Sequence, residues 1–188
     1  MYLQTNECPA INPNMNPNTD NQTSPDHTIL LVENDPDDVF FFRQALREAN
    51  LNVRMWVACN GQEAIDYLDR QSAFAELTGN SCPSLVLLDL RIPNKNGFEV
   101  LSWARQQPEL ERLVVVMLTS STQPADIDRA YYLGANEYLV KPADFNSMVD
   151  LVKSIHSFWL GSSRPAQLAN QPEEPMARSD RELTVPAH

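Results

Sequence analysis

Positive charge is scarce in this sequence. Among 188 residues there are 14 lysines and arginines but 25 aspartates and glutamates, which gives a formal net charge of −11. Phosphate backbones and anionic lipid surfaces repel a chain of this charge, so direct binding to nucleic acid or to a membrane is not expected. The charge therefore favours proteins or cations as partners.

Paired cysteines and long apolar runs are lacking as well. The three cysteines, Cys8, Cys59 and Cys82, form no C-x-x-C pair and have no histidine at metal-ligand spacing, so we expect neither a disulfide framework nor a zinc site. The longest apolar run, residues 113–118, is about a third of a membrane span. The first thirty residues hold no basic segment followed by an apolar one. These absences predict a cytoplasmic protein.

Apolar residues are also sparse at both ends of the chain. Residues 1–26 contain six Asn and four Pro, and residues 164–188 contain four more Pro among scattered charges. Such segments cannot bury enough apolar surface to offset the entropy of ordering them. We therefore expect a disordered arm over residues 1–26, one compact domain over 27–161 and a flexible tail over 162–188.

Two patterns alternate inside the compact domain. Short apolar or β-branched runs, typical of strands, lie at residues 28–32, 53–58, 85–88, 113–118 and 137–140. Between and after them, apolar residues recur at helical spacing over residues 36–49, 61–74, 98–106, 124–133 and 143–160. The first, third and fourth runs are apolar almost throughout, which indicates strands buried on both faces. The pattern predicts an α/β fold with a doubly wound five-stranded parallel sheet, a (βα)5 arrangement of flavodoxin type.

Polar side chains follow four of the predicted strands. They are Glu33, Asn34 and Asp35 after the first, Asp89 after the third, Thr119 and Ser120 after the fourth, and Lys141 after the fifth. Singly, each has an ordinary role as a helix cap or a solvated side chain. In an open parallel sheet, however, the carboxyl ends of the strands meet at the ligand-binding rim. A carboxylate beside another acid, a lysine and a hydroxyl suits a divalent cation and a phosphoryl group, and hard oxygen ligands favour Mg²⁺.

Four segments of the sequence resemble the signature segments of the response regulator receiver domain of two-component signalling. They lie at residues 29–38, 85–97, 116–121 and 134–142, in the family's order and with the expected elements between them. The similarity covers about residues 28–160, and within it the chain looks like stand-alone regulators, including those paired with bacterial phytochrome kinases.

The resemblance implies a role for each matching residue. Asp89 is similar to the phosphoacceptor, whose carboxylate attacks a phosphohistidine or an acyl phosphate. Thr119 resembles the switch hydroxyl, Lys141 the cation that pairs with the phosphoryl group, and Tyr138 the aromatic ring that moves with the switch. The resemblance also implies a cis peptide bond between Lys141 and Pro142.

The implied Mg²⁺ site departs from the family at one residue. Its ligands would be Glu33, Asn34, Asp89 and the backbone carbonyl of Arg91, but the family usually has two adjacent acids where this chain has Glu33 and Asn34. An amide oxygen brings no charge, so weaker metal binding is expected, and Asp35 is a possible replacement. An alternative is therefore a pseudo-receiver, which docks partners without being phosphorylated. A phosphohydrolase fits less well, because those enzymes resemble Asp-x-Asp where Asp89 is followed at the second place by Arg91.

The resemblance also implies partners. A sensor histidine kinase or a histidine phosphotransfer protein would donate the phosphoryl group, and a downstream protein would receive the signal. Phe40 is a candidate contact with the kinase. Tyr131 and Tyr132 are candidates for a downstream contact or a homodimer through residues 124–133, 137–140 and 143–160. No enzymatic activity is expected beyond self-phosphorylation from a phosphodonor and autodephosphorylation.

Overall fold

The computed structural model describes residues 27–69 and 82–161. Its strands are β1 (His27–Val32), β2 (Val53–Ala58), β3 (Leu85–Leu88), β4 (Val115–Thr119) and β5 (Glu137–Val140). Its helices are α1 (Pro36–Glu48), α2 (Gly61–Asp69), α4 (Gly97–Arg105), α5 (Pro124–Tyr132) and α6 (Phe145–Ile155), with short helical turns η1 (Pro108–Leu110) and η2 (His156–Leu160). The expected disordered arm over residues 1–26 and flexible tail over residues 162–188 lie outside the described residues.

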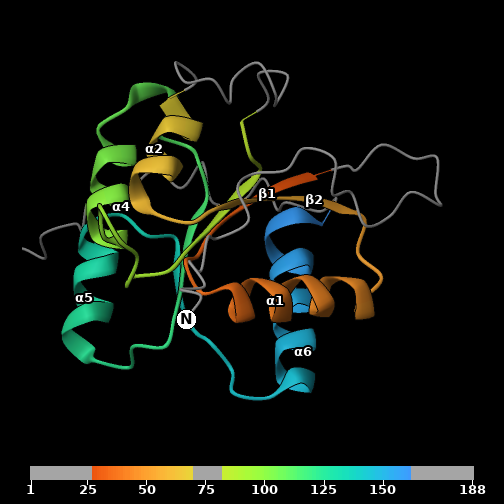
Figure 1. Cartoon of the computed structure of the whole chain (residues 1–188). Helices are drawn as coiled ribbons and strands as arrows, with labels where there is room; N and C mark the ends of the chain where they lie inside the picture. The colour runs from red at the N-terminus through yellow and green to blue at the C-terminus, as the bar shows by residue number, and fades with distance from the viewer. Residues whose placement is uncertain (1–26, 70–81, 162–188) are drawn as a thin grey trace, which may run out of the picture.

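The five strands form one parallel sheet in the order β2-β1-β3-β4-β5. Helices α1 and α6 cover one face of this sheet, and α2, α4 and α5 cover the other (Figure 1). The predicted doubly wound (βα)5 fold is therefore confirmed. The chain leaves β1 toward β2 on one side and then crosses to β3 on the other, so the carboxyl ends of β1 and β3 lie side by side at the switch in strand order.

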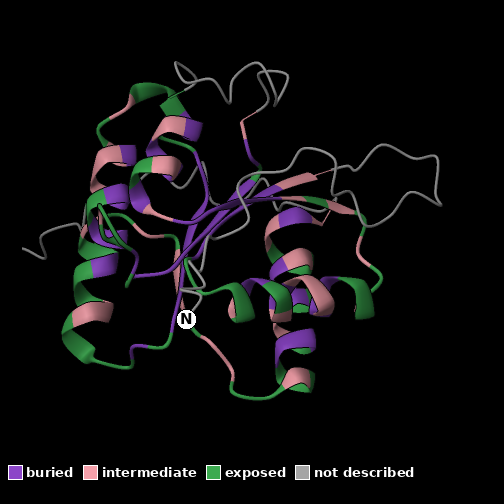
Figure 2. Ribbon diagram, viewed as in Figure 1, coloured by how far each residue is buried: buried purple, intermediate pink, exposed green. Residues whose placement is uncertain are grey.

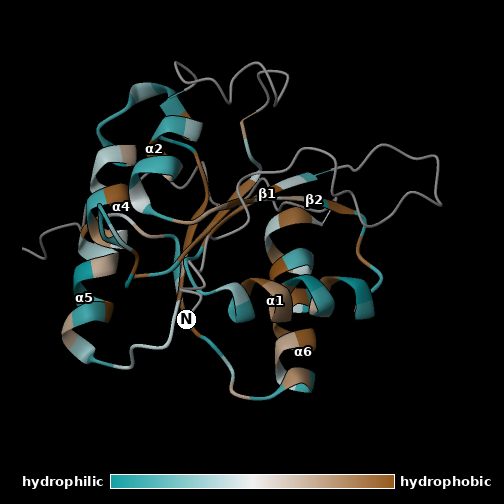
Figure 3. Cartoon of the chain, in the orientation of Figure 1, coloured by the Kyte–Doolittle hydropathy of each residue, from teal (hydrophilic) through white to brown (hydrophobic). Residues whose placement is uncertain are grey.

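The continuous apolar runs are explained by burial on both faces of the sheet. Along β1, Ile29 and Leu31 pack toward α1 and α6, while Leu30 and Val32 pack toward the other helices. This alternation is the period of two that an extended strand imposes. Figure 2 shows the sheet as the most deeply buried layer, and Figure 3 shows the same strands as the most hydrophobic.

The helix boundaries follow local signals in the sequence. Asp35 caps α1, accepting a hydrogen bond from the backbone N–H of Asp37 at 2.9 Å, and Pro36 occupies the first turn. At α2 the Asn60 side chain accepts from the backbone N–H of Glu63 at 3.0 Å and so caps this helix. The Glu63 carboxylate, however, accepts from Cys59 N–H.

Several predicted boundaries and bonds need correction. The strand expected over residues 113–118 is β4, Val115–Thr119. The last helix ends as α6 at Ile155 and continues as a π-helical turn. The part of the second predicted helix beyond residue 69 lies outside the described residues. Every peptide bond in the described ranges is trans, which is the preferred isomer even before proline, so the implied cis bond at Pro142 is not found.

The cysteine prediction is wrong at one position. Cys82 is a free thiol, but the sulfur of Cys59 is disulfide-bonded. Spacing could not reveal this, because cysteines far apart in a sequence can still pair in space. Separately, no helix in the described ranges has both the length and the apolar character needed to cross a membrane.

Candidate functional site

The sheet register brings the predicted site residues to one rim. Val32 of β1 pairs with Leu88 of β3, so the next residues, Glu33 and Asp89, leave the sheet side by side. At the other side of β3, Thr119 pairs with Val140, and the backbone N–H of Lys141 donates to the Thr119 carbonyl at 2.9 Å. The ends of β1, β3 and β5 thus bring Glu33, Asp89 and Lys141 together at one rim of the sheet.

Asp89 is held in a fixed orientation. It is 7% exposed, and its Oδ1 accepts hydrogen bonds from the backbone N–H groups of Leu90 at 2.6 Å and Arg91 at 3.4 Å. Its Oδ2 lies 3.1 Å from Lys141 Nζ. A Cβ atom on Gly97 would approach the Asp89 carbonyl oxygen to 2.4 Å, so only glycine lets the next helix start this close to the site. Such a carboxylate is oriented to act as a nucleophile.

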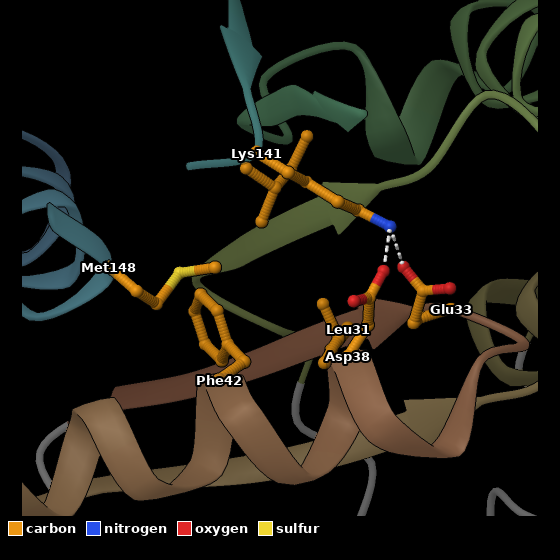
Figure 4. A pocket seen from close by; sticks show the side chains of 7 residues that line it. Leu31, Glu33, Asp38, Phe42, Lys141 and Met148 are labelled. Atoms are coloured by element: carbon orange, nitrogen blue, oxygen red, sulfur yellow. Dashed lines mark hydrogen bonds and ion pairs between the residues drawn. The ribbon is translucent and has the colours of Figure 1, made fainter. Parts of the chain in front are cut away.

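The ammonium group of Lys141 lies among three carboxylates. It donates hydrogen bonds to Glu33, to Asp38 Oδ2 at 2.7 Å and to Asp89 Oδ2 at 3.1 Å. Figure 4 shows the lysine reaching down from the end of β5 to Glu33 and Asp38. Burial alone would lower the pKa of Lys141, but the hydrogen bonds to Asp38 and Glu33 outweigh it and raise the pKa above the ordinary 10.5. The lysine is therefore a permanent cation at neutral pH.

Glu33 is the most deeply buried acid of the cluster. It is 2% exposed, and its Oε1 accepts from the backbone N–H of Asp35 at 3.0 Å while Oε2 accepts from Lys141. Burial raises the pKa of the Glu33 carboxyl above its ordinary 4.5, and the hydrogen bond from Lys141 opposes that rise only in part. A cation beside Glu33 therefore favours the ionised form of its carboxyl.

Asp38 belongs to the cluster although the sequence analysis did not single it out. It lies in the first turn of α1, where acids are common because they interact favourably with the helix dipole, so the sequence pattern does not distinguish it from its neighbour Asp37. The signal in the sequence that could identify Asp38 is its spacing along the helix. Asp38 stands three residues after the cap Asp35, on the side of the helix that faces the rim.

The predicted metal ligands are brought together only in part. Glu33 and Asp89 meet at Lys141, whereas Asn34 is exposed and Asp35 is engaged in capping α1. In the part of the chain that the structure describes, no three His, Cys, Asp or Glu side chains are arranged to hold a metal ion. The lysine ammonium lies at the centre of the carboxylates instead. The donor chemistry still fits, because carboxylate oxygens are the ligands that Mg²⁺ and Mn²⁺ prefer.

The predicted switch residues form a second set of contacts. Thr119 is fully buried, and its Oγ1 accepts from the backbone N–H of Ser121 at 3.4 Å. The Tyr138 hydroxyl donates to the Ser121 carbonyl at 3.0 Å, and the Ser121 hydroxyl donates to Asp126 in α5 at 2.6 Å. Burial raises the pKa of Tyr138, so its hydroxyl stays protonated. Ser121 and Asp126, which the sequence analysis missed, thus link the rim to α5.

A small cavity lies beneath the lysine on the α1 side of the sheet. Its volume is about 10 Å³, and it is lined by Leu31, Glu33, Asp38, Phe42, Leu118, Lys141 and Met148 (Figure 4). This is about the space of one water molecule, so the cavity holds no organic substrate.

The aromatic residues predicted to contact partners are on the surface. Phe40 of α1 is 61% exposed, Tyr131 is half exposed and Tyr132 is 89% exposed at the end of α5. Phe42, by contrast, is buried, as 100° per residue along a helix requires. Val140 and Phe158 are also exposed large apolar residues, and the sequence analysis did not single them out.

Comparisons with known proteins agree with this architecture. A family model described as response regulator receiver domain matches residues 29–153. Response regulator Rcp1 from Synechocystis is 34% identical over 139 residues, which cover 74% of this chain and 92% of Rcp1. The solved structure of the phosphorylated cyanobacterial phytochrome response regulator RcpA matches with a TM-score of 0.67 at 34% identity, covering 73% of this chain and 96% of RcpA. The Mn²⁺-bound form of Rcp1 matches with a TM-score of 0.64 at 34% identity over the same shares.

Proposed function

Because the chain belongs to the response regulator receiver domain family, we propose that it accepts a phosphoryl group on Asp89 and signals through contacts with other proteins. The observation that carries this proposal is the pairing of an oriented Asp89 carboxylate with the Lys141 ammonium at the switch point of a parallel sheet. The resemblance of the sequence segments at this rim supports the same roles.

The proposed reaction is a phosphoryl transfer. Asp89 Oδ2, the oxygen that the Leu90 and Arg91 amides do not hold, attacks phosphorus of a phosphohistidine or an acyl phosphate. The bond from phosphorus to the donor's nitrogen or oxygen breaks, and its electron pair leaves with the donor. Lys141 then pairs with the phosphoryl group, to which the Thr119 hydroxyl donates a hydrogen bond. The product is an aspartyl phosphate.

Charge is the main obstacle to this reaction. Phosphorylated Asp89 would carry about two negative charges in place of one, beside Glu33 and Asp38, and like charges 4 Å apart repel by about 4 kcal/mol at an effective dielectric of 20. Bound Mg²⁺ would neutralise this charge, held by Glu33, Asp89 and, as the resemblance implies, Asn34 and the Arg91 carbonyl. Support comes from the carboxylate cluster itself and from the Mn²⁺-bound form of Rcp1.

The phosphodonor is proposed to be a sensor histidine kinase or a histidine phosphotransfer protein. RcpA is described as a phytochrome response regulator, which favours a kinase of the phytochrome type. The exposed Phe40 on α1 is the proposed kinase contact, and the exposed Tyr131 and Tyr132 form the proposed downstream or homodimer contact. We propose a cytoplasmic location, no contact with nucleic acid or membrane, and no turnover beyond self-phosphorylation and autodephosphorylation.

Phosphorylation of Asp89 can be tested directly. The chain is incubated with acetyl phosphate and MgCl₂ and run on a phosphate-affinity gel. We expect a retarded band that disappears in Asp89→Asn and on adding EDTA, and that persists in Asp37→Asn, which neutralises an exposed acid outside the cluster.

The alternative function predicts a different gel. A pseudo-receiver would show no retarded band under any condition, because Asn34 would have abolished useful metal binding. The observation that favours this alternative is the neutral Asn34, which stands where the family usually has an acid. A band of equal intensity in Asp89→Asn would place the phosphoryl group on another residue.

A further inference from the structure

An open groove lies between α4 and α5, on the face of the sheet opposite α1 and α6. The two helices lie side by side at this place (Figure 1). The volume of the groove is about 290 Å³, against about 10 Å³ for the cavity beneath Lys141. Ligand pockets in proteins begin at about 300 Å³. The groove therefore has room for side chains of a partner, which the cavity does not.

The floor of the groove is apolar. Phe98 of α4 is 6% exposed, and the guanidinium of Arg129 in α5 covers its ring, with Cζ 4.4 Å from the ring centroid. Trp103 and Leu133 also line the groove, and each is half-buried against the core. Sites that bind ligands combine such an apolar lining with a few polar groups. The groove can thus hold a large apolar side chain.

The charge left unpaired in the groove is that of Arg129. Within the described residues, its guanidinium makes no ion pair or hydrogen bond and contacts the face of the Phe98 ring. Glu99 lines the same groove, but its Oε2 accepts from the backbone N–H of Asn96 at 2.9 Å in the capping box of α4. A guanidinium presents five donors in one plane and no acceptor, and a carboxylate is the group that pairs with it best.

The other polar groups of the groove also favour an acidic ligand. Among the described residues, the indole N–H of Trp103 has no acceptor. Ser102 and Gln106 are neutral, and the Gln106 amide donates to the Ser102 hydroxyl at 3.3 Å. Charge complementarity therefore favours an acid of a partner at this place. The net charge of −11, however, repels a partner with a run of acids, so a single carboxylate beside an apolar side chain fits best.

We infer that the groove between α4 and α5 docks a short segment of a partner protein in which one Asp or Glu lies next to a large apolar side chain. The carboxylate pairs with Arg129, which the Phe98 ring holds in place, and the apolar side chain lies against Trp103 and Leu133. The inference rests on the proposed function, because it gives the chemistry of the downstream protein that the proposed function requires.

A peptide array tests the chemistry of the ligand. Each peptide carries one central Glu, Gln or Lys, flanked by every combination of Leu, Phe and Ser, and the array is probed with the full chain. We expect the strongest signals from peptides with Glu beside Leu or Phe. The strongest of these is then labelled with fluorescein and titrated by anisotropy, and it should bind about tenfold or more tightly than its Gln counterpart, as a hydrogen bond to a charged group implies.

Variants of Arg129 test where the carboxylate lies. Arg129→Gln should weaken binding of the Glu peptide about tenfold or more and leave binding of the Gln peptide unchanged. Arg129→Glu should reverse the preference, so that the Lys peptide binds more tightly than the Glu peptide. Arg112→Gln removes the same charge from an exposed residue outside the groove, and it should change the affinity less than about twofold. Arg129→Lys keeps the charge without the planar fork, serves as a second variant should Arg129→Gln fail to fold, and should bind the Glu peptide with intermediate affinity.

Three results would overturn the inference. The first is an array without preference for Glu over Gln, and the second is equal affinity for the Glu peptide in Arg129→Gln and the unaltered chain. The third is self-association of the unaltered chain that Arg129→Gln abolishes, which would show that a second copy covers the groove. The peptide measurements use no phosphodonor, so none of these results touches the proposed phosphorylation of Asp89. Only the absence of a retarded band on the phosphate-affinity gel contradicts that function.

Discussion

Glu33, Asp38, Asp89 and Lys141 carry more negative than positive charge at a largely buried position. Lys141 has three donors and uses them on three carboxylates, so its ammonium is fully hydrogen-bonded. One positive charge nevertheless faces three negative ones, and burial makes that imbalance costly. The consequence is visible at Glu33, whose pKa is raised by burial despite the lysine beside it.

The raised pKa of Glu33 predicts how stability depends on pH. The folded chain holds the Glu33 proton more tightly than the unfolded chain, whose carboxyl has the ordinary pKa of 4.5. The resulting stabilisation is complete below pH 4.5 and is lost as pH rises through the raised value. In metal-free buffer, the unfolding temperature of the unaltered chain should therefore fall relative to that of Glu33→Gln as pH rises from 4.5 toward neutral.

Thermal unfolding followed by circular dichroism in EDTA, at a series of pH values, checks this expectation. Asp37→Asn is the matched control, because it removes one acid of the same helix region without touching the cluster. A difference between Glu33→Gln and the unaltered chain that stays constant with pH would show that Glu33 titrates as a solvated carboxyl.

Residues of this site differ in how far the sequence could predict them. Asp89 and Lys141 each follow a strand and Thr119 ends one, and parallel strands end at one rim, so their meeting could be predicted from position alone. Asp38 follows no strand. Its role depends on which side of α1 faces the rim. Only the fold shows this, because the contacting residue, Lys141, lies 103 positions further along the chain.

At the scale of elements, contacts between distant segments are what sequence patterns miss. Arg105 at the end of α4 donates from Nε to the Gly134 carbonyl at 2.9 Å and from a terminal nitrogen to Asn136 Oδ1 at 3.0 Å. The same Asn136 oxygen accepts from the backbone N–H of Val115 at 2.8 Å. These bonds fix the start of β5 relative to β4, and hence the strand that carries Lys141. Periodicity predicted each element but not this connection, which depends on side-chain reach.

We predict that the exposed face of α5 is a site of self-association. Tyr131 and Tyr132 are exposed on it, and Tyr138 of β5 is linked through Ser121 to Asp126 in the same helix. A change at the rim can therefore reach the exposed face. We expect phosphorylation to promote dimers, and Tyr132→Arg to weaken them about tenfold or more, as loss of an interface aromatic does. Sedimentation velocity with and without acetyl phosphate and MgCl₂ measures this.

Phe40→Arg is the control for that experiment. It makes the same kind of substitution at an exposed aromatic of α1, which we assign to the kinase rather than to a dimer. Phe40→Arg should dimerise like the unaltered chain. If Phe40→Arg lost the dimer and Tyr132→Arg kept it, the assignment of the two faces would be reversed. If the unaltered chain stayed monomeric with and without phosphorylation, the tyrosines would keep only the proposed contact with a downstream protein.

The whole molecule carries a net charge of −11, so its stability should respond to cations in two ways. Any salt relieves the repulsion among its acids by screening. A divalent ion bound at the rim adds a specific term, because it binds the folded chain and not the unfolded one. At a concentration a hundred times the dissociation constant, that term amounts to about 2.7 kcal/mol. MgCl₂ should therefore raise the unfolding temperature by several degrees, and the rise should continue logarithmically at concentrations above the dissociation constant.

The two effects are separable by comparing MgCl₂ with NaCl at equal ionic strength. NaCl should give only the screening part, which is shared by every variant that loses one acid. The remaining Mg²⁺-specific rise should shrink in Glu33→Gln and persist in Asp37→Asn, because Glu33 is one of the proposed Mg²⁺ ligands and Asp37 is an exposed acid outside the cluster. Were NaCl to reproduce the whole rise in the unaltered chain, the acids at the rim would act as part of a general negative field, with Lys141 as their permanent counter-ion.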